Sequence, residues 1–355
     1  MTQISFEVAA DPRDAASLPP ALYTDPAVFT AERDAIFARE WMAVARSEWL
    51  AAPNSYLACD LVGDPIVLTR DAEGELRAFS NVCLHRACPI ASGRGNASQL
   101  TCPYHRWTYG LDGRLKGTPL MEQARDFDRA ALRLPGLAVE EWLGWIFVNA
   151  DADAPPLAPR LTALHERLAP FGVESMRICQ TLRFDSPWNW KVMVENFMES
   201  YHHMGAHPET LNAAFPAAGT HWVDLPGEFA LLENPSKHES AAPFWVMCVF
   251  PTLLFALTRG EPPTGFWYQM DLHGYDRFTL DIHLLAPPAL ADDADFVAGY
   301  AEIANAIHLE DIPMCEGVWK GLNSGYARIG RLSHLEATNW RFHRYLAERL
   351  SRATG

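Results

Sequence analysis

The spacing of hydrophobic residues predicts a helical start, a middle block of strands and a mixed second half. The stretch DPAVFTAERDAIFAREW predicts a helix over residues 25–41. From Ser55 onward the runs become short and alternating, as in SYLACDL, PIVLTR, ELRAFSN and, at 142–150, WLGWIFVNA, and these predict strands. The segment DADAPPLAP at 151–159 has the composition of a linker.

The second half mixes both patterns. Residues 189–204, NWKVMVENFMESYHHM, carry hydrophobic residues at a helical period. Apolar strands are expected around 244–257, 266–272 and 278–286, and helices after about residue 292. The chain is therefore expected to be an α+β protein with an N-terminal arm and helix (1–41), a β-rich domain (42–150) and a mixed domain (151–355).

Composition narrows the function classes. The 355 residues include 29 Lys and Arg against 44 Asp and Glu, a net charge of −15, which disfavours binding to nucleic acid or to an anionic membrane. No secretory signal or membrane-spanning apolar run is visible, so a cytoplasmic protein is expected. Seven scattered cysteines do not form a disulfide framework, because their number is odd and the expected compartment is reducing.

Two short loops in the β-rich block each carry a cysteine and a histidine. NVCLHRACP supplies Cys83 and His85, and LTCPYHRW supplies Cys102 and His105. A Cys₂His₂ zinc site is one interpretation. However, only one residue separates Cys83 from His85, which is closer than the usual spacing of two ligands that bind the same zinc ion. A binuclear [2Fe–2S] cluster fits better, with the cysteines on one iron and the histidines on the other. The neutral imidazoles would raise its reduction potential.

This pattern, with C-x-x-H followed by Trp107, resembles the Rieske domain. The CPYH surroundings strengthen the resemblance. Ala87 and Arg106 stand where many members of that family carry glycine, but neither position is a ligand.

A second constellation lies in ENFMESYHHMGAHPET, residues 195–210. A helix would place Glu199 and His202 on one face. His207 is out of register with His202, but Gly205 and a following proline allow the helix to end or bend and turn His207 back. Two imidazoles then need a carboxylate to complete a facial triad, which holds non-haem Fe(II) and leaves positions open.

Position alone does not choose the carboxylate. Glu195 and Glu199 are near in sequence, and HLEDIPMCEGVW offers Glu310 and Asp311. Asp311 is also suited to capping a helix, because Pro313 fits a first helical turn.

The stretch NWKVMVENFMESYHHMGAHPET resembles the catalytic iron motif of Rieske non-haem iron oxygenases, the α subunits of ring-hydroxylating and N-demethylating systems. The ending GRLSHLEATNWRFHRYL is similar to the carnitine and glycine-betaine oxygenase branch. The resemblance implies that Glu199 bridges the cluster of one subunit and the iron of its neighbour. It implies iron ligands at His202, His207 and Asp311, and pocket positions at Asn196 and Phe197. His203 is also expected to line the pocket, because it is adjacent to a ligand.

The same resemblance implies the architecture and the partners. Residues 42–150 would be the Rieske domain, and 1–41 with 151–355 a catalytic domain in which helices flank an antiparallel sheet (helix-grip, START-like). A homotrimer is expected. Because the chain has no G-x-G-x-x-G signature, an NAD(P)H-dependent reductase, directly or through a ferredoxin, must be a separate protein.

The implied activity is hydroxylation of a small organic substrate with O₂: monooxygenation, dioxygenation or oxidative N-demethylation of an aromatic or quaternary ammonium compound. GFWYQM at 265–270 reads most simply as a strand that packs both faces, although it could supply a cation–π wall. Two other classes stay open. One is a small Rieske electron carrier, which would leave residues 160–355 without a task, and the other is a zinc-ribbon interaction module.

Overall fold

The computed structural model describes residues 4–238 and 242–352. The chain divides into two compact units. One runs from Ala38 to Leu157, and the other combines the chain up to Phe37 with the chain from Ala158 onward. Both units are built on antiparallel sheets, and the expected α+β class is confirmed.

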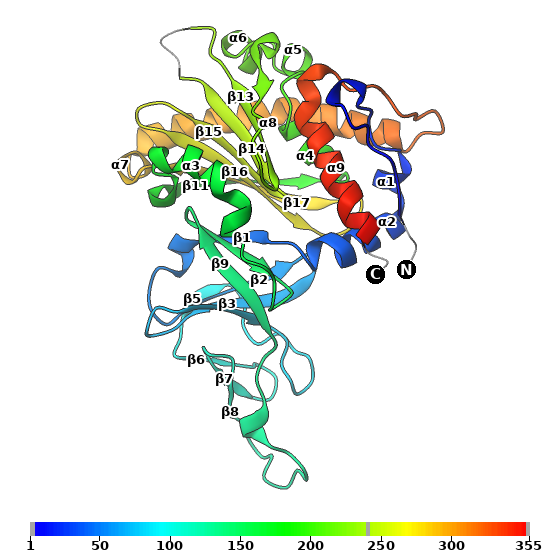
Figure 1. The fold of residues 1–355 in the computed structure, drawn as a ribbon. Helices are drawn as coiled ribbons and strands as arrows, with labels where there is room; N and C mark the ends of the chain where they lie inside the picture. The colour runs from blue at the N-terminus through cyan, green and yellow to red at the C-terminus, as the bar shows by residue number, and fades with distance from the viewer. Residues whose placement is uncertain (1–3, 239–241, 353–355) are drawn as a thin grey trace. The chain divides into compact units, whose positions relative to one another are not determined.

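The unit from Ala38 to Leu157 contains two sheets (Figure 1). The larger has the strand order β1-β10-β9-β4-β3-β2-β5, and the smaller the order β6-β7-β8. The core between them includes Cys83, Cys102, Trp107 and Tyr109. The strands are β1 (Met42–Arg46), β2 (Ser55–Leu61), β3 (Asp64–Arg70), β4 (Leu76–Ser80), β5 (Arg94–Asn96), β6 (Gln99–Thr101), β7 (Thr108–Gly110), β8 (Leu115–Gly117), β9 (Gly136–Trp142) and β10 (Trp145–Asn149).

The other unit has one seven-stranded sheet, in the order β11-β17-β16-β15-β14-β13-β12. The long helix α8 runs across this sheet in Figure 1. The strands are β11 (Arg177–Ser186), β12 (His221–Trp222), β13 (Phe229–Asn234), β14 (Phe244–Val249), β15 (Leu253–Thr258), β16 (Thr264–Leu272) and β17 (Phe278–Ala286). The helices are α1 (Ala21–Thr24), α2 (Pro26–Glu32), α3 (Thr162–Leu168), α4 (Trp190–Phe197), α5 (His203–Ala206), α6 (Leu211–Ala214), α7 (Pro288–Ala291), α8 (Ala294–Leu322) and α9 (Ala337–Arg352).

Several expected elements are interrupted. The expected helix over 25–41 is α2 followed by a π-helical segment, Arg33–Phe37, and it ends at Phe37, before β1 begins at Met42. The expected strand over 142–150 is a hairpin, since Leu143 and Gly144 both have positive φ and turn the chain between β9 and β10. Local hydrophobicity does not reveal such breaks, because the turn residues are themselves apolar or flanked by apolar residues.

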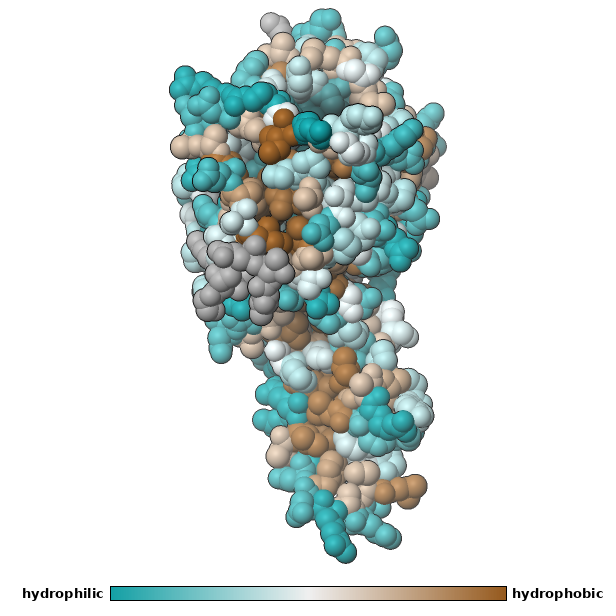
Figure 2. Space-filling view, turned by 90° about the vertical axis from the view of Figure 1, so that its right-hand side faces the viewer, coloured by the Kyte–Doolittle hydropathy of each residue, from teal (hydrophilic) through white to brown (hydrophobic). Residues whose placement is uncertain are grey.

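The face of the molecule drawn in Figure 2 is mostly hydrophilic, and its hydrophobic side chains gather in separate places. Within residues 4–238 and 242–352, no helix combines the length and the hydrophobicity needed to cross a membrane.

A buried ion pair joins the N-terminal segment to α4. Lys191 Nζ lies 2.6 Å from Glu32 Oε1, and both side chains are only 1% exposed. Trp190 Nε1 donates a hydrogen bond to the other oxygen of Glu32 at 2.9 Å. The charge of Glu32 is thus compensated from the first turn of α4, which fixes that turn against α2.

Lys191→Met should leave the Glu32 carboxylate buried without its counter-ion. We expect the free energy of unfolding of this unit to fall by about 3–5 kcal/mol, measured by denaturant unfolding followed by tryptophan fluorescence. Glu32→Gln combined with Lys191→Met removes both charges and should recover much of the loss. The exposed Lys320→Met is the matched control. A loss in Lys191→Met no larger than in this control would contradict the prediction.

Candidate metal centres

The two Cys/His loops are closed by backbone hydrogen bonds around their cysteines. Cys83 N donates to the carbonyl of Cys88 at 3.0 Å, and Cys102 N donates to that of Trp107 at 2.8 Å. Both thiols are buried, at 3% and 1% exposure. Tyr109 Oη lies 3.3 Å from Cys83 Sγ, a contact of the kind that tunes the potential of an iron–sulfur centre.

The two histidines of these loops lie next to each other. The ring centroids of His85 and His105 are 4.5 Å apart, and His85 also stacks on Trp107 at 4.9 Å. His85 Nδ1 is buried and has no hydrogen-bond partner among the described residues. An orphaned ring nitrogen beside a second imidazole and two buried thiols is a donor set that fits a [2Fe–2S] cluster.

Ala87 and Arg106 occupy equivalent turns of the two loops. Their φ angles are +54° and +62°, in the left-handed region that favours glycine. Ala87 N bonds to the carbonyl of Cys83, and Arg106 N to that of Cys102. The turn geometry explains why glycine is common at these positions of the family, and this chain adopts the same turns without it.

The second site brings together His202, His207 and Asp311, whose ligand atoms all lie within 4.8 Å of one another. The Nε2 atoms of His207 and His202 are 2.9 and 3.5 Å from Asp311 Oδ1. Although burial opposes ionisation, hydrogen bonding to His207 and the charges of both histidines lower the pKa of Asp311. Two imidazoles and one ionised carboxylate are the donor set of a facial iron triad.

The chain reaches this geometry by breaking the expected helix earlier than Gly205. α4 ends at Phe197, and a turn carries Glu199 and His202 before the short α5. Glu199 Oε2 accepts the backbone N–H of His202 at 3.0 Å, and Glu199 Oε1 lies 2.7 Å from His202 Nδ1. The pairing of Glu199 with His202 therefore arises in a turn, not on the face of a continuous helix.

The competing carboxylates have other partners. Glu195 accepts from Tyr23 Oη at 2.6 Å and lies 2.8 Å from His343 Nε2. Glu310 lies 2.6 Å from His207 Nδ1, an orienting contact that the sequence pattern did not identify. Asp311 caps no helix, since it lies inside α8.

Both imidazoles share one arrangement. His202 Nδ1 faces Glu199 and His207 Nδ1 faces Glu310, while both Nε2 atoms face Asp311. A metal-binding histidine characteristically donates its second N–H to a carboxylate, which fixes the tautomer and the ring orientation. The three residues thus fit a mononuclear metal held through Nε2, Nε2 and a carboxylate oxygen.

A cavity of about 300 Å³ lies beside this triad. Asn196, Phe197 and His203, the expected pocket residues, all line it. Asn196 Nδ2 also donates to Asp311 Oδ1 at 3.0 Å. His203 is 3% exposed, and its Nδ1 has no hydrogen-bond partner in the described chain.

Aromatic rings in contacting pairs form much of the cavity wall. Phe266 and Tyr268, from the GFWYQM stretch of β16, line the cavity. Trp267 lies between them, points to the other face of the strand and packs on His283. Burial raises the pKa values of the two tyrosines of the wall, so both keep their protons. The pairs, with their centroid separations, are Phe197–Tyr268 at 4.8 Å, Phe215–Phe244 at 4.6 Å and Phe266–Tyr300 at 4.7 Å.

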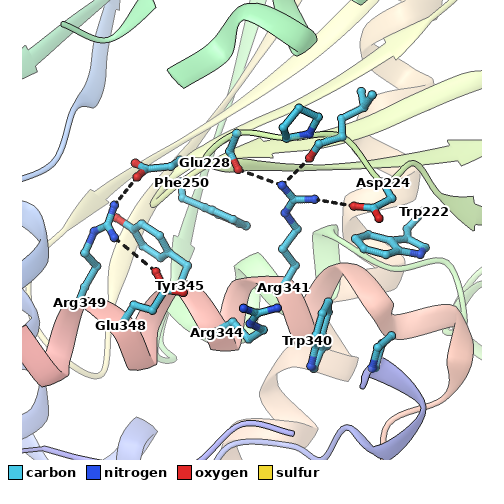
Figure 3. Close-up of a pocket in the computed structure, with 14 residues that line it drawn as sticks. Trp222, Asp224, Glu228, Phe250, Trp340, Arg341, Arg344, Tyr345, Glu348 and Arg349 are labelled. Atoms are coloured by element: carbon cyan, nitrogen blue, oxygen red, sulfur yellow. Dashed lines mark hydrogen bonds and ion pairs between the residues drawn. The ribbon is translucent and has the colours of Figure 1, made fainter. Parts of the chain in front are cut away.

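A larger hollow of about 700 Å³ lies along α9, and none of the expected site residues lines it (Figure 3). Arg341 reaches from α9 to Asp224 at 3.5 Å and donates to the carbonyl of Gly227 at 2.9 Å. Arg349 pairs with Glu228 at 2.6 Å. These bonds attach α9 to the loop between β12 and β13. The charged side chains of Arg341 and Arg349 in the larger hollow are therefore explained by contacts within the fold.

Comparison with known proteins agrees with this geometry. A family model described as the Rieske [2Fe-2S] domain matches residues 40–133. Another, described as ring hydroxylating alpha subunit (catalytic domain), matches residues 173–248 and 227–352. The carnitine monooxygenase oxygenase subunit of Acinetobacter baumannii is 31% identical over 342 residues, which cover 92% of this chain and 91% of that protein.

Two further matches are a relative aligned over a shorter part of the chain and a solved structure with a similar fold. The glycine betaine monooxygenase oxygenase subunit of Chromohalobacter salexigens is 37% identical over 198 residues, 56% of this chain and 44% of that protein. The crystal structure of a quaternary ammonium Rieske monooxygenase in complex with L-carnitine has a TM-score of 0.87 and 28% identity, and the match covers 98% of this chain and 99% of that chain.

The chain belongs to the Rieske non-haem iron oxygenases, as an oxygenase α subunit. The family carries a [2Fe–2S] cluster and a mononuclear iron, and both donor sets described above fit these groups. As the oxygenase part of a multicomponent system it works with a reductase and O₂. The match to the catalytic domain rules out both a small electron carrier and a zinc-ribbon module.

Proposed function

We propose that this chain is the terminal oxygenase that hydroxylates a small quaternary ammonium compound, with electrons from an NAD(P)H-dependent reductase. The observation that carries the proposal is the triad of His202, His207 and Asp311 beside an aromatic-walled cavity of about 300 Å³. The relatives named for carnitine and glycine betaine oxidation support the substrate class. Aromatic walls suit such cations, because the faces of the rings attract positive charge.

We assign the metal ligands residue by residue. Cys83 and Cys102 would hold one iron of the cluster and His85 and His105 the other, within the Rieske domain over 42–150. The catalytic domain, 1–41 with 151–355, would hold Fe(II) through His202, His207 and Asp311. When bound, the cluster supplies single electrons and the mononuclear iron activates O₂.

The surrounding residues orient these ligands. Glu199 and Glu310 accept the Nδ1–H groups of His202 and His207, which leaves each Nε2 lone pair directed toward the metal position. Asn196 donates to Asp311 and restrains its carboxylate. The aromatic side chains that line the cavity would hold the substrate beside His202, His207 and Asp311.

Glu199 has a second proposed task. In a homotrimer it would join the imidazole of His202 to His105 of a neighbouring copy, so that electrons cross between subunits. Its 2.7 Å contact with His202 provides one half of such a bridge.

The activity is tested by anaerobic loading with Fe(II), a surrogate reductase, NADH and a panel of quaternary ammonium compounds. We expect substrate-dependent O₂ uptake coupled to a hydroxylated product, or to an aldehyde where hydroxylation at carbon next to nitrogen breaks the C–N bond. A cluster that the reductase reduces, with no compound of the panel or aromatic hydrocarbon oxidised, would contradict the oxygenase function.

Asp311→Ala should abolish stoichiometric binding of mononuclear iron and leave the visible spectrum of the cluster unchanged. Glu310→Ala removes only the partner of His207 Nδ1, and we expect iron affinity to fall by about 10–100-fold. Glu316→Ala, an exposed acidic position on the same helix, is the control. Iron analysis across the three variants tests the assignment, and an iron deficit in Glu310→Ala larger than in Asp311→Ala would show that the wrong carboxylate was chosen.

Glu199→Ala should retain the cluster and, with Fe(II) in excess, the mononuclear iron. Loss of the bridge should slow single-turnover re-oxidation of the reduced cluster by about 10–100-fold in stopped-flow absorbance with substrate and O₂. Glu199→Gln keeps a hydrogen-bond acceptor, so its re-oxidation rate should lie between those of the wild type and Glu199→Ala. Re-oxidation of Glu199→Ala at the wild-type rate would end the bridge proposal, whereas failure to bind iron in excess Fe(II) would make Glu199 a ligand.

A further inference from the structure

The charges that line the active-site cavity are unusual for a site that would accept a zwitterion. The described lining includes three pairs of aromatic rings and the carboxylates of Glu199 and Asp311, but no lysine or arginine. A substrate carboxylate that enters this cavity would find no cationic side chain in the described lining to pair with it. A buried carboxylate without a partner is strongly unfavourable.

The arginine adjacent in sequence to a residue of the cavity lining already has partners of its own. Arg259 follows the lining residue Thr258, yet its Nη2 lies 2.9 Å from Glu233 Oε1 and its guanidinium lies over the ring of Trp245 at 4.4 Å. Fe(II), when bound, would bring two positive charges, and the two carboxylates of the lining, Asp311 and Glu199, would match them. A histidine that holds a metal is neutral, so His202 and His207 would add no charge to the lining when Fe(II) is bound.

The walls favour a cation. The pairs Phe215–Phe244 and Phe266–Tyr300 place ring surfaces around the cavity, and the negative potential of ring faces attracts an ammonium group. The net charge of −15 on the whole chain also steers cations toward the protein.

We propose that this cavity selects a small ammonium ion that carries no carboxylate and discriminates against betaines. The inference rests on the proposed function and refines its substrate class. Carnitine and glycine betaine, after which the relatives are named, are both zwitterions with a carboxylate, so this chain would differ from them in the charge of its substrate.

Three matched ligands test the proposal by anaerobic isothermal titration calorimetry on the holoenzyme. Choline is the cation, 3,3-dimethylbutan-1-ol replaces its nitrogen by carbon, and glycine betaine replaces its alcohol by a carboxylate. We expect choline to bind at least about tenfold tighter than either of the others. Binding is measured without turnover, so the result is separable from that of the O₂-uptake test.

Variants locate the effect in the cavity. Phe215→Leu removes one ring face and should weaken choline binding by about tenfold, while binding of the neutral alcohol changes much less. Phe171→Leu is the matched control, because Phe171 packs on Trp245 and does not line the cavity. Equal losses for choline and the alcohol in Phe215→Leu would overturn recognition of the cation by that ring.

The ligand series gives further decisive outcomes. Glycine betaine that binds as tightly as choline would overturn the discrimination, and loss of its binding in Lys237→Gln would then identify this exposed lysine as the counter-charge. The neutral alcohol binding as tightly as choline would overturn selection by charge. Binding of none of the three would overturn the proposal, even if an aromatic compound is hydroxylated in the O₂-uptake test.

Discussion

A buried carboxylate in the middle of a long helix constrains the whole catalytic unit. Asp311 is 5% exposed and lies inside α8, so its charge has to be compensated by side chains that reach it from elsewhere in the fold. Its partners, at 2.9 to 3.5 Å, are Asn196, His202 and His207, all from one segment after the start of α4. That requirement explains why α4 stops at Phe197. A continuous helix would carry residues 202 and 207 to different faces, whereas the turn and the short α5 direct both imidazoles toward α8.

The other end of α4 is fixed just as firmly. Asn189 caps the helix and donates from Nδ2 to the carbonyls of Tyr23 and Tyr275, while Lys191 pairs with Glu32. The N-terminal segment therefore belongs to the catalytic unit for a physical reason. It supplies the charge that allows a lysine to be buried in the first turn of the helix that precedes the proposed iron ligands. The positions of His202 and His207 thus depend on Glu32, which lies at least 170 positions earlier in the sequence.

The sequence predicted which residues form the candidate sites better than it predicted the backbone conformation that brings them together. Cys83, His85, Cys102, His105, His202 and His207 could be selected by residue type and spacing, and the structure brings each set together. The choice of Asp311 over its neighbour needed the family resemblance. The contact of Glu310 with His207 stayed hidden because adjacent residues of a helix point in different directions, and only the placement of α8 decides which partner each meets. The aromatic wall was also only partly visible: Phe266 and Tyr268 lie on one predicted strand, but Phe215, Phe244 and Tyr300 join them through strand pairing and helix packing over long separations.

The Rieske loops show how backbone strain and metal binding are connected. Ala87 and Arg106 adopt left-handed conformations, which cost a non-glycine residue about 1–2 kcal/mol each relative to its preferred region. Each loop offsets this cost by a hydrogen bond from the strained residue back to its cysteine and by a second bond from the cysteine N–H across the turn. Both bonds hold the thiols inward, where a bound cluster would add its own cross-link between the two loops, and metal binding of this kind contributes directly to folding. The strained turns therefore lie in the two loops whose cysteines and histidines would hold the cluster.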